Sequence, residues 1–281
     1  MKPSQLCAYL MCVLLLSYSI ARAQEPAAAN GKFVAVNGAS IYYEEYGQGE
    51  PLILLHGFGE TAAHWKPYIS AFSKHYRVIA WDMRGHGRST SPDTSKVFRH
   101  ATAAQDLLAF IDKLGLQRVK AIGHSSGGII ILYAATQAPD RFEAIVPMSA
   151  QLYYSTQTRE AIRINARPEI QYERLEFEKR HGPLKGRLIA RQFYHFVELY
   201  GDPAITPDQL ETITARSLII HGDNDFVPVS QAWEMYQHIP NAHLWIVPNG
   251  WHLPHVGGAK ELDFIARSLE FLQGGWSDAS K

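Results

Sequence analysis

The stretch that decides the fold of this chain is Val119-Lys120-Ala121-Ile122-Gly123-His124-Ser125-Ser126-Gly127-Gly128. A short apolar run ends in the pattern Gly-x-Ser-x-Gly, and residues 129–138 then have the composition of a helix. A strand, a sharp turn and a helix are the setting in which a serine side chain is exposed above a sheet as a nucleophile. Side chains two residues before and after that serine would collide in so tight a turn, and Gly123 and Gly127 have none. The pattern therefore predicts that Ser125 is a nucleophile. Ser126 does not fit, because His124 stands where its first glycine should be.

The composition is that of one large globular domain. The chain has 281 residues, 46% of them hydrophobic, and a formal net charge of zero. A chain of this length can bury a substantial core. The neutral balance, with no basic cluster, argues against a nucleic-acid partner.

The N-terminus has the pattern of a secretory signal peptide. Lys2 precedes the apolar run 6–20, and Ala21-Arg22-Ala23 forms a small-x-small cleavage site, so cleavage is expected before Gln24. Residues 1–23 are thus predicted to be a leader and residues 24–30 a short linker, which makes the protein secreted or periplasmic. The apolar run is short for a bilayer span, so no stable membrane span is expected after cleavage. An uncleaved anchor, or a cytosolic protein whose leader is unused, remains an alternative.

Both cysteines, Cys7 and Cys12, lie in this leader. The mature chain would therefore contain none. This excludes disulfides, cysteine nucleophiles, thiolate zinc sites and iron–sulfur clusters from residues 24–281.

Strand-like and helix-like segments alternate along the rest of the chain. Such alternation predicts an α/β fold with a mostly parallel sheet and helices on both faces. An Asn37-Gly38 turn predicts an antiparallel hairpin at the start. The expected strands are 32–36, 41–46, 52–55, 77–81, 119–122, 144–148, 217–220 and 243–247, and the expected helices 65–73, 102–114, 129–138, 230–239 and 260–272. About 151–207 the alternation stops, and three helix-like pieces predict a small cap inserted into the single domain 31–281.

Five motifs carry a resemblance to a known family. They are His56-Gly57-Phe58-Gly59, the run 82–89 (Asp-Met-Arg-Gly-His-Gly-Arg-Ser), the Ser125 motif, the run 221–225 (His-Gly-Asp-Asn-Asp), and Gly250-Trp251-His252. In this order, from about residue 31 to 272, they resemble the α/β-hydrolase superfamily, and most of all serine esterases of the biphenyl hydrolase-like type. The resemblance implies the α/β-hydrolase fold and the chain order nucleophile, acid, histidine.

A serine hydroxyl needs a base to take its proton and an acid to orient that base. The resemblance assigns His252 as the base, with His255 as the local alternative. It assigns Asp225 as the acid by its spacing from the preceding glycine, with Asp223 as a loop-ordering carboxylate. Some relatives carry their acid before the cap, but Pro147-Met148-Ser149 offers no carboxylate there, which strengthens Asp225.

Two backbone N–H groups should form the oxyanion hole. The geometry of the turn assigns that of Ser126, and the resemblance assigns that of Phe58. The run 82–89 is interpreted as a hydrogen-bonded turn, and His56, His86 and His124 as packing and loop residues. No cofactor is expected. No metal is expected either, because the grouping of His221, Asp223, Asp225, His252 and His255 has no recognised ligand spacing.

Aromatic residues in the cap are candidates for lining an apolar pocket, although they can equally attach the cap to the core. They are Tyr153, Tyr154, Tyr172, Phe177, Phe193, Tyr194, Phe196 and Tyr200. Of these, Tyr154, Phe177, Phe193 and Tyr194 are the predicted substrate contacts.

The sequence therefore predicts a serine hydrolase that cleaves small-molecule carboxylic esters through an acyl-enzyme. The same triad could act on a lactone, an amide or a carbon–carbon bond, or in perhydrolysis, because a fold does not fix the bond. A hydrolase-like binding protein with little turnover is the alternative of a different class. Haloalkane dehalogenation and epoxide hydrolysis are disfavoured. The resemblance associates both reactions with an aspartate nucleophile, whereas the turn here carries Ser125.

Overall fold

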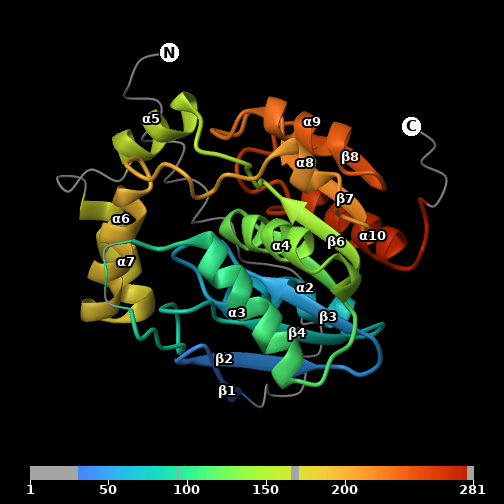
Figure 1. Ribbon diagram of the computed structural model, residues 1–281, viewed down its shortest axis with the longest axis horizontal. Helices are drawn as coiled ribbons and strands as arrows, with labels where there is room; N and C mark the ends of the chain where they lie inside the picture. The colour runs from blue at the N-terminus through green and yellow to red at the C-terminus, as the bar shows by residue number, and fades with distance from the viewer. Residues whose placement is uncertain (1–30, 94, 96, 166–170, 277–281) are drawn as a thin grey trace.

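The computed structural model describes residues 31–93, 95, 97–165 and 171–276 (Figure 1). The predicted signal peptide and linker lie outside these residues, and so does the side chain of Tyr172.

A central sheet of eight strands organises the molecule, in the order β1-β2-β4-β3-β5-β6-β7-β8. β1 and β2 are antiparallel to their neighbours, and every pair from β4 to β8 is parallel. The predicted α/β architecture is confirmed. The strands are β1 (Lys32–Val36), β2 (Ala39–Tyr46), β3 (Pro51–Leu55), β4 (Arg77–Trp81), β5 (Val119–His124), β6 (Phe142–Met148), β7 (Arg216–Gly222) and β8 (Ala242–Val247).

The hairpin predicted at the start of the sheet is confirmed. Val36 pairs with Ala39, and the two turn residues Asn37 and Gly38 have φ values of 46° and 77°. Positive φ at both central positions is the type I′ geometry that matches the twist of a hairpin, and asparagine and glycine tolerate it best.

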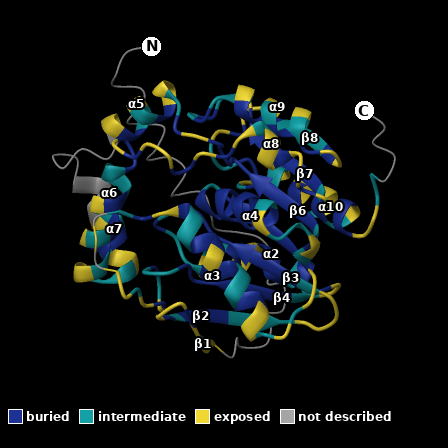
Figure 2. Ribbon diagram, viewed as in Figure 1, coloured by how far each residue is buried: buried dark blue, intermediate teal, exposed yellow. Residues whose placement is uncertain are grey.

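Helices cover both faces of the sheet (Figure 1). Side chains of β3 point alternately to the two faces: Ile53 and Leu55 join one apolar cluster, and Leu52 and Leu54 join the other. The first cluster includes residues of α3 (His100–Lys113), α4 (Ser126–Gln137) and α9 (Val229–His238), and the second includes residues of α2 (Lys66–Phe72) and α10 (Ala259–Leu272). Figure 2 shows α4 almost wholly buried, because it lies between the sheet and other helices.

Several element boundaries differ by one to three residues from the sequence-based expectation, and two of them lie at the Ser125 turn. β5 runs to His124, two residues further, and α4 begins at Ser126 instead of residue 129. Glycines lower helix propensity, so the pattern placed the start of the helix after Gly128. In the structure Gly127 and Gly128 belong to the first turn of α4. Glycine is required at position 127 because neighbouring backbone lies too close for a side chain there.

The segment between β6 and β7 contains three helices, α5 (Thr156–Asn165), α6 (Gln171–His181) and α7 (Pro183–His195), and the short α8 (Pro207–Leu210) precedes β7. α6 and α7 lie side by side at one end of the sheet (Figure 1). They are attached to the loops that follow β3 and β4: Arg180 and His181 both donate hydrogen bonds of 2.8 Å to the Gly59 carbonyl, and Lys185 donates one of 2.8 Å to the Gly87 carbonyl.

The carboxyl ends of the parallel strands lie at one edge of the sheet. β3, β5, β7 and β8 are followed there by loops that carry Phe58, Ser125, Asp225 and His252 respectively. Open α/β sheets bind ligands at this edge. The topology therefore brings together residues that are far apart in the sequence.

Candidate active site

Ser125 lies in a strained turn between β5 and α4. Its φ and ψ are 52° and −117°, a conformation that residues with side chains rarely adopt. The neighbouring glycines permit it: a Cβ on Gly123 would lie 2.5 Å from the backbone of Gly127, and a Cβ on Gly127 would lie 2.3 Å from the carbonyl oxygen of Leu55. The Ser125 N–H is held by the carbonyl of Met148 on β6, at 2.8 Å.

The structure brings Ser125, His252 and Asp225 into one hydrogen-bonded chain. Nε2 of His252 lies 2.9 Å from Oγ of Ser125, and Nδ1 lies 2.9 and 3.0 Å from the two carboxylate oxygens of Asp225. A carboxylate only accepts hydrogen bonds, so Nδ1 carries the proton and the lone pair of Nε2 faces the serine hydroxyl. This is the arrangement in which a histidine can remove the proton of a serine.

Asp225 is buried and held in a fixed orientation. Its Oδ1 also accepts the N–H of Val227 at 3.0 Å, and His221 donates to the carbonyl of Val227 at 3.0 Å. Burial acts to raise the pKa of Asp225, but the His252 and His221 imidazoles outweigh it and lower the pKa below its usual value. The carboxylate is therefore ionised at neutral pH.

The two alternatives considered for the base and the acid lie elsewhere. His255 is fully buried, and its Nε2 lies 2.8 Å from Nε2 of His64 instead of facing Ser125. Asp223 is exposed, and its Oδ1 accepts the N–H of Asn249 at 2.8 Å. It orders the loop that leads to His252.

Both predicted oxyanion donors border the Ser125 turn. Ser126 is the first residue of α4, whose first N–H groups have no partner within the helix. Phe58 follows the end of β3, the strand that pairs with β5. Neither the Phe58 N–H nor the Ser126 N–H donates a hydrogen bond to any other residue in the described part of the chain.

The run 82–89 forms the hydrogen-bonded turn that was expected. The carboxylate of Asp82 accepts the N–H groups of Ala62 and Arg88, both at 2.7 Å, and Ser89 donates to the Asp82 carbonyl at 2.6 Å. His56 is fully buried, donates to the Gly57 carbonyl at 2.7 Å and accepts the Met83 N–H at 3.0 Å. These residues fix the loop that carries Phe58.

The predicted substrate contacts divide into two groups. Phe193 lies near Phe58 and Phe177, with ring centroids 6.1 Å from each, and Phe177 contacts Gly59. Tyr154 stacks on Phe196 at 5.3 Å, next to His100 at 6.3 Å. Tyr194 has no described ring contact with these residues; the one described for it is with His195.

Sequence reasoning did not find Phe226 and His100 as residues that support the site, and it interpreted His124 only as a packing and loop residue. The ring of Phe226 packs on that of His252, with centroids 4.2 Å apart. His124 donates to the backbone carbonyl of His252 at 2.8 Å, and His100 contacts Oγ of Ser126 at 3.0 Å. Phe226 and His124 are each adjacent to a triad residue, which was the available signal. His100 lies on α3, and nothing in its local sequence points to Ser126.

Comparisons with known proteins agree with this fold. A family model described as the alpha/beta hydrolase fold matches residues 50–175. The chain is 29% identical over 271 residues to the Serine hydrolase BPHL of Homo sapiens, covering 88% of this chain and 90% of that protein. It is 35% identical over 117 residues to an epoxide hydrolase of Caballeronia sordidicola, covering 41% of this chain and 36% of that protein.

A solved structure is similar over almost the whole fold. It is a serine hydrolase involved in carbazole degradation, with a TM-score of 0.72 and 24% identity, covering 88% of this chain and 99% of that one. The family model and the serine hydrolase relative together support a hydrolase of the α/β-hydrolase superfamily, and the solved structure shows the same fold.

Proposed function

We propose that this hydrolase cleaves carboxylic esters through an acyl-enzyme formed on Ser125. The observation that carries the proposal is the His252 imidazole, which lies between Oγ of Ser125 at 2.9 Å and the Asp225 carboxylate at 2.9 Å. A hydroxyl in contact with a fixed, neutral imidazole is the activated nucleophile of acyl transfer.

In the first step, Nε2 of His252 takes the proton of Ser125 while Oγ attacks the ester carbonyl. The carbonyl oxygen becomes an oxyanion, which the N–H groups of Phe58 and Ser126 stabilise. His252 then gives its proton to the leaving alcohol, and the C–O bond breaks. Asp225 stabilises the imidazolium that exists between these two proton transfers.

In the second step, a water molecule takes the place of the alcohol. His252 removes a proton from the water, and the resulting hydroxide attacks the acyl-enzyme. The same two N–H groups stabilise the second oxyanion. Collapse of that intermediate releases the carboxylic acid and returns the proton to Ser125, so the enzyme is regenerated without a net change.

Aromatic rings beside the oxyanion loop support an apolar substrate group. Phe58 is in ring contact with Phe98, Phe193 and Phe196, at 5.1, 6.1 and 4.7 Å between centroids. Phe193 and Phe177 come from the cap, so we assign them as contacts for the apolar part of the ester.

Serine at position 125 supports an ester over an epoxide or a haloalkane. An acyl-serine is an ester that water can cleave, whereas opening an epoxide with serine would leave an ether on the enzyme. The similarity to an epoxide hydrolase therefore bears on the fold rather than on the bond that is cleaved.

We also propose that the protein is exported, with cleavage after Ala23. The support is the charged, apolar and small-x-small pattern of residues 2–23. In the part of the chain that the structure describes, no helix has the length and hydropathy to cross a membrane. Intact-mass analysis of the protein recovered from a secreting host tests this: a chain that starts at Gln24 supports export, and a full-length chain inside the cell contradicts it.

The ester hydrolase activity is tested by comparing wild type with Ser125→Ala on p-nitrophenyl esters of increasing acyl length. We expect hydrolysis by the wild type and a loss of at least about 1,000-fold in kcat for the variant, because removing a triad serine leaves only oxyanion binding. An unchanged circular dichroism spectrum shows that the variant is folded. Equal turnover by both proteins would exclude Ser125 as the nucleophile. A wild type inactive on every ester, but active on an amide or a carbon–carbon bond, would replace the ester.

A further inference from the structure

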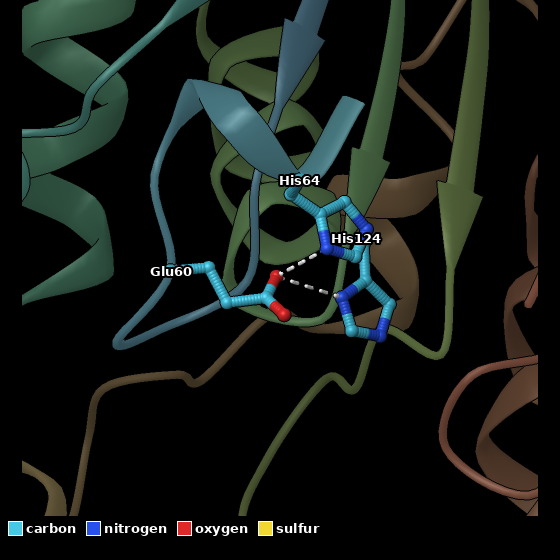
Figure 3. Close-up of side chains that lie close together, drawn as sticks. All are labelled: Glu60, His64 and His124. Carbon is cyan, nitrogen blue, oxygen red and sulfur yellow. Dashed lines mark ion pairs between the residues drawn. The ribbon is translucent and has the colours of Figure 1, made fainter. Parts of the chain in front are cut away.

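A second cluster of titratable side chains lies next to the triad, where His124 contacts the backbone carbonyl of His252. It consists of Glu60, His64, His124 and His255 (Figure 3 shows the first three). Glu60 and His64 follow the oxyanion loop, His124 precedes the nucleophile, and His255 follows the base. The mechanism proposed above uses none of these four side chains.

Three donor atoms of the cluster converge. Oε2 of Glu60 lies 2.9 Å from Nδ1 of His64 and 3.6 Å from Nδ1 of His124, and all three atoms lie within 4.8 Å of one another (Figure 3). Gly57 makes room for them, because a Cβ there would lie 2.9 Å from Nδ1 of His124 and 3.1 Å from Oε2 of Glu60. Donors bound to a tetrahedral Zn²⁺ at about 2.0 Å lie about 3.3 Å apart, so only small shifts separate these atoms from metal ligation.

The hydrogen bonds fix which nitrogen of His124 carries a proton. Its Nε2 lies 2.8 Å from the carbonyl oxygen of His252, and a carbonyl only accepts, so Nε2 is the donor. The lone pair of a neutral His124 is therefore on Nδ1. That atom is buried and has no hydrogen-bond partner among the described residues, and it faces the Glu60 carboxylate. A lone pair facing an anion is repulsive, and a cation between them removes the repulsion.

The outer contacts are those of metal-bound side chains. A metal-ligating histidine usually donates its other ring N–H to a carbonyl or another acceptor, as His124 does to His252. His64 has the equivalent partner in His255, whose Nε2 lies 2.8 Å away. Glu60 is further oriented by the Gly57 N–H at 3.1 Å.

We propose that Glu60, Nδ1 of His64 and Nδ1 of His124 bind one Zn²⁺ ion, with water in the fourth position. Two imidazoles and one carboxylate are a common zinc ligand set. The ligands follow β3 and end β5, and through His252 and His255 they contact the loop after β8. The ion would therefore hold together the three segments that carry the oxyanion donor, the nucleophile and the base. None of these three ligands belongs to the grouping without recognised ligand spacing, which consists of His221, Asp223, Asp225, His252 and His255. The site does not depend on the bond that the enzyme cleaves.

The test is direct binding of Zn²⁺ to the protein without its leader (residues 24–281). The protein is first freed of metal with a chelator, and binding is measured by competition with a chromophoric chelator. We expect one ion per chain for the wild type. Removing one of three ligands, in Glu60→Gln or in His124→Gln, should raise the Kd for Zn²⁺ at least about 100-fold. At a Zn²⁺ concentration 100 times the Kd, the thermal unfolding midpoint of the wild type should rise by roughly 5 to 10 °C, and that of Glu60→Gln should not.

Two control variants locate the ion. Glu198→Gln breaks an exposed pair in which Glu198 lies 2.8 Å from His195. Asp225→Asn alters the carboxylate that accepts the hydrogen bond of His252. Both should bind Zn²⁺ as the wild type does. The proposal is overturned if the wild type binds no Zn²⁺, if Glu60→Gln binds it equally well, or if Asp225→Asn abolishes binding, since the ion would then occupy the triad. Glu60→Gln keeps the size of the side chain, so its result holds even if His124→Gln does not fold.

Discussion

Both carboxylate oxygens of Asp225 lie within hydrogen-bonding distance of Nδ1 of His252, at 2.9 and 3.0 Å. The carboxylate thereby selects the histidine tautomer whose Nε2 can accept a proton from Ser125. An amide can donate instead, and in Asp225→Asn it would favour the other tautomer. We expect kcat for ester hydrolysis to fall by about 10,000-fold with the fold retained, measured by steady-state kinetics and circular dichroism.

Asp223→Asn is the matched control, because Asp223 lies two residues away in the same loop and is exposed. Its Oδ1 only orders the loop through the Asn249 N–H, and an asparagine oxygen can accept the same hydrogen bond. We expect activity within a few-fold of wild type. Equal losses in the two variants would mean that loop order, rather than the tautomer of His252, accounts for the effect.

Buried histidines make the stability of the protein depend on pH. Burial lowers the pKa of His56 from 6.5 to about 4, so in the folded state the neutral form is favoured. Between these pH values the unfolded chain binds the extra proton and the folded chain does not. The stabilisation from a neutral His56 is therefore complete above about pH 6.5 and is lost as the pH falls toward 4. The accumulated loss of unfolding free energy at pH 4 is about 3 kcal/mol.

Urea unfolding at several pH values between 7.5 and 4.5 tests this expectation. In His56→Asn the slope of unfolding free energy against pH should be shallower by up to one proton, even though the variant is less stable at pH 7. His75→Asn, at an exposed histidine, serves as the matched histidine-to-asparagine control. A slope unchanged in His56→Asn would show that this ring is protonated in the folded state as readily as in the unfolded chain.

The cap and the oxyanion loop meet at Gly59. Its φ is 78°, and a Cβ there would lie 2.1 Å from Cε1 of Phe177. Gly59→Ala should therefore lose stability through both backbone strain and this clash. The strain alone is expected to cost about 1–2 kcal/mol. The clash should add a coupling of about 1 kcal/mol or more that Phe177→Ala removes, in a double-mutant cycle followed by urea unfolding.

Gly182→Ala isolates the strain. Gly182 has a φ of 83°, but a Cβ there would have nothing within 4 Å. It should lose only the strain energy, and Phe177→Ala should not rescue it. Rescue of both glycine variants by Phe177→Ala would mean that Phe177 destabilises the cap for another reason.

Local pattern was enough to predict the fold. The glycines around Ser125, the Asn37-Gly38 turn and the apolar runs of the parallel strands each determine their own backbone or burial, so they can be recognised within a few residues. The triad residues Asp225 and His252 also lie in short motifs that follow strands. Their placement at one edge of the sheet follows from the parallel topology.

The surroundings of the triad could not be predicted in the same way. Glu60, His64 and His124 meet only because the ends of β3 and β5 are adjacent, and His100 reaches Ser126 from a different helix. No spacing in the sequence records such contacts. Tyr194 was selected for its position in the cap, but neighbours on a helix face different directions, and only Phe193 faces Phe58.

The hydroxyl and the N–H of Ser126 have separate roles. The N–H is the proposed oxyanion donor, while Oγ contacts Nε2 of the fully buried His100 at 3.0 Å. Ser126→Ala removes only the hydroxyl and leaves His100 without that partner, at a cost of about 1–3 kcal/mol in unfolding free energy. The N–H remains, so kcat for ester hydrolysis should fall by less than about tenfold, against a 100- to 1,000-fold effect for a lost oxyanion donor. Parallel urea unfolding and steady-state kinetics separate the two effects. A loss of 100-fold or more with unchanged stability would show that the Ser126 hydroxyl, rather than its N–H alone, acts on the substrate.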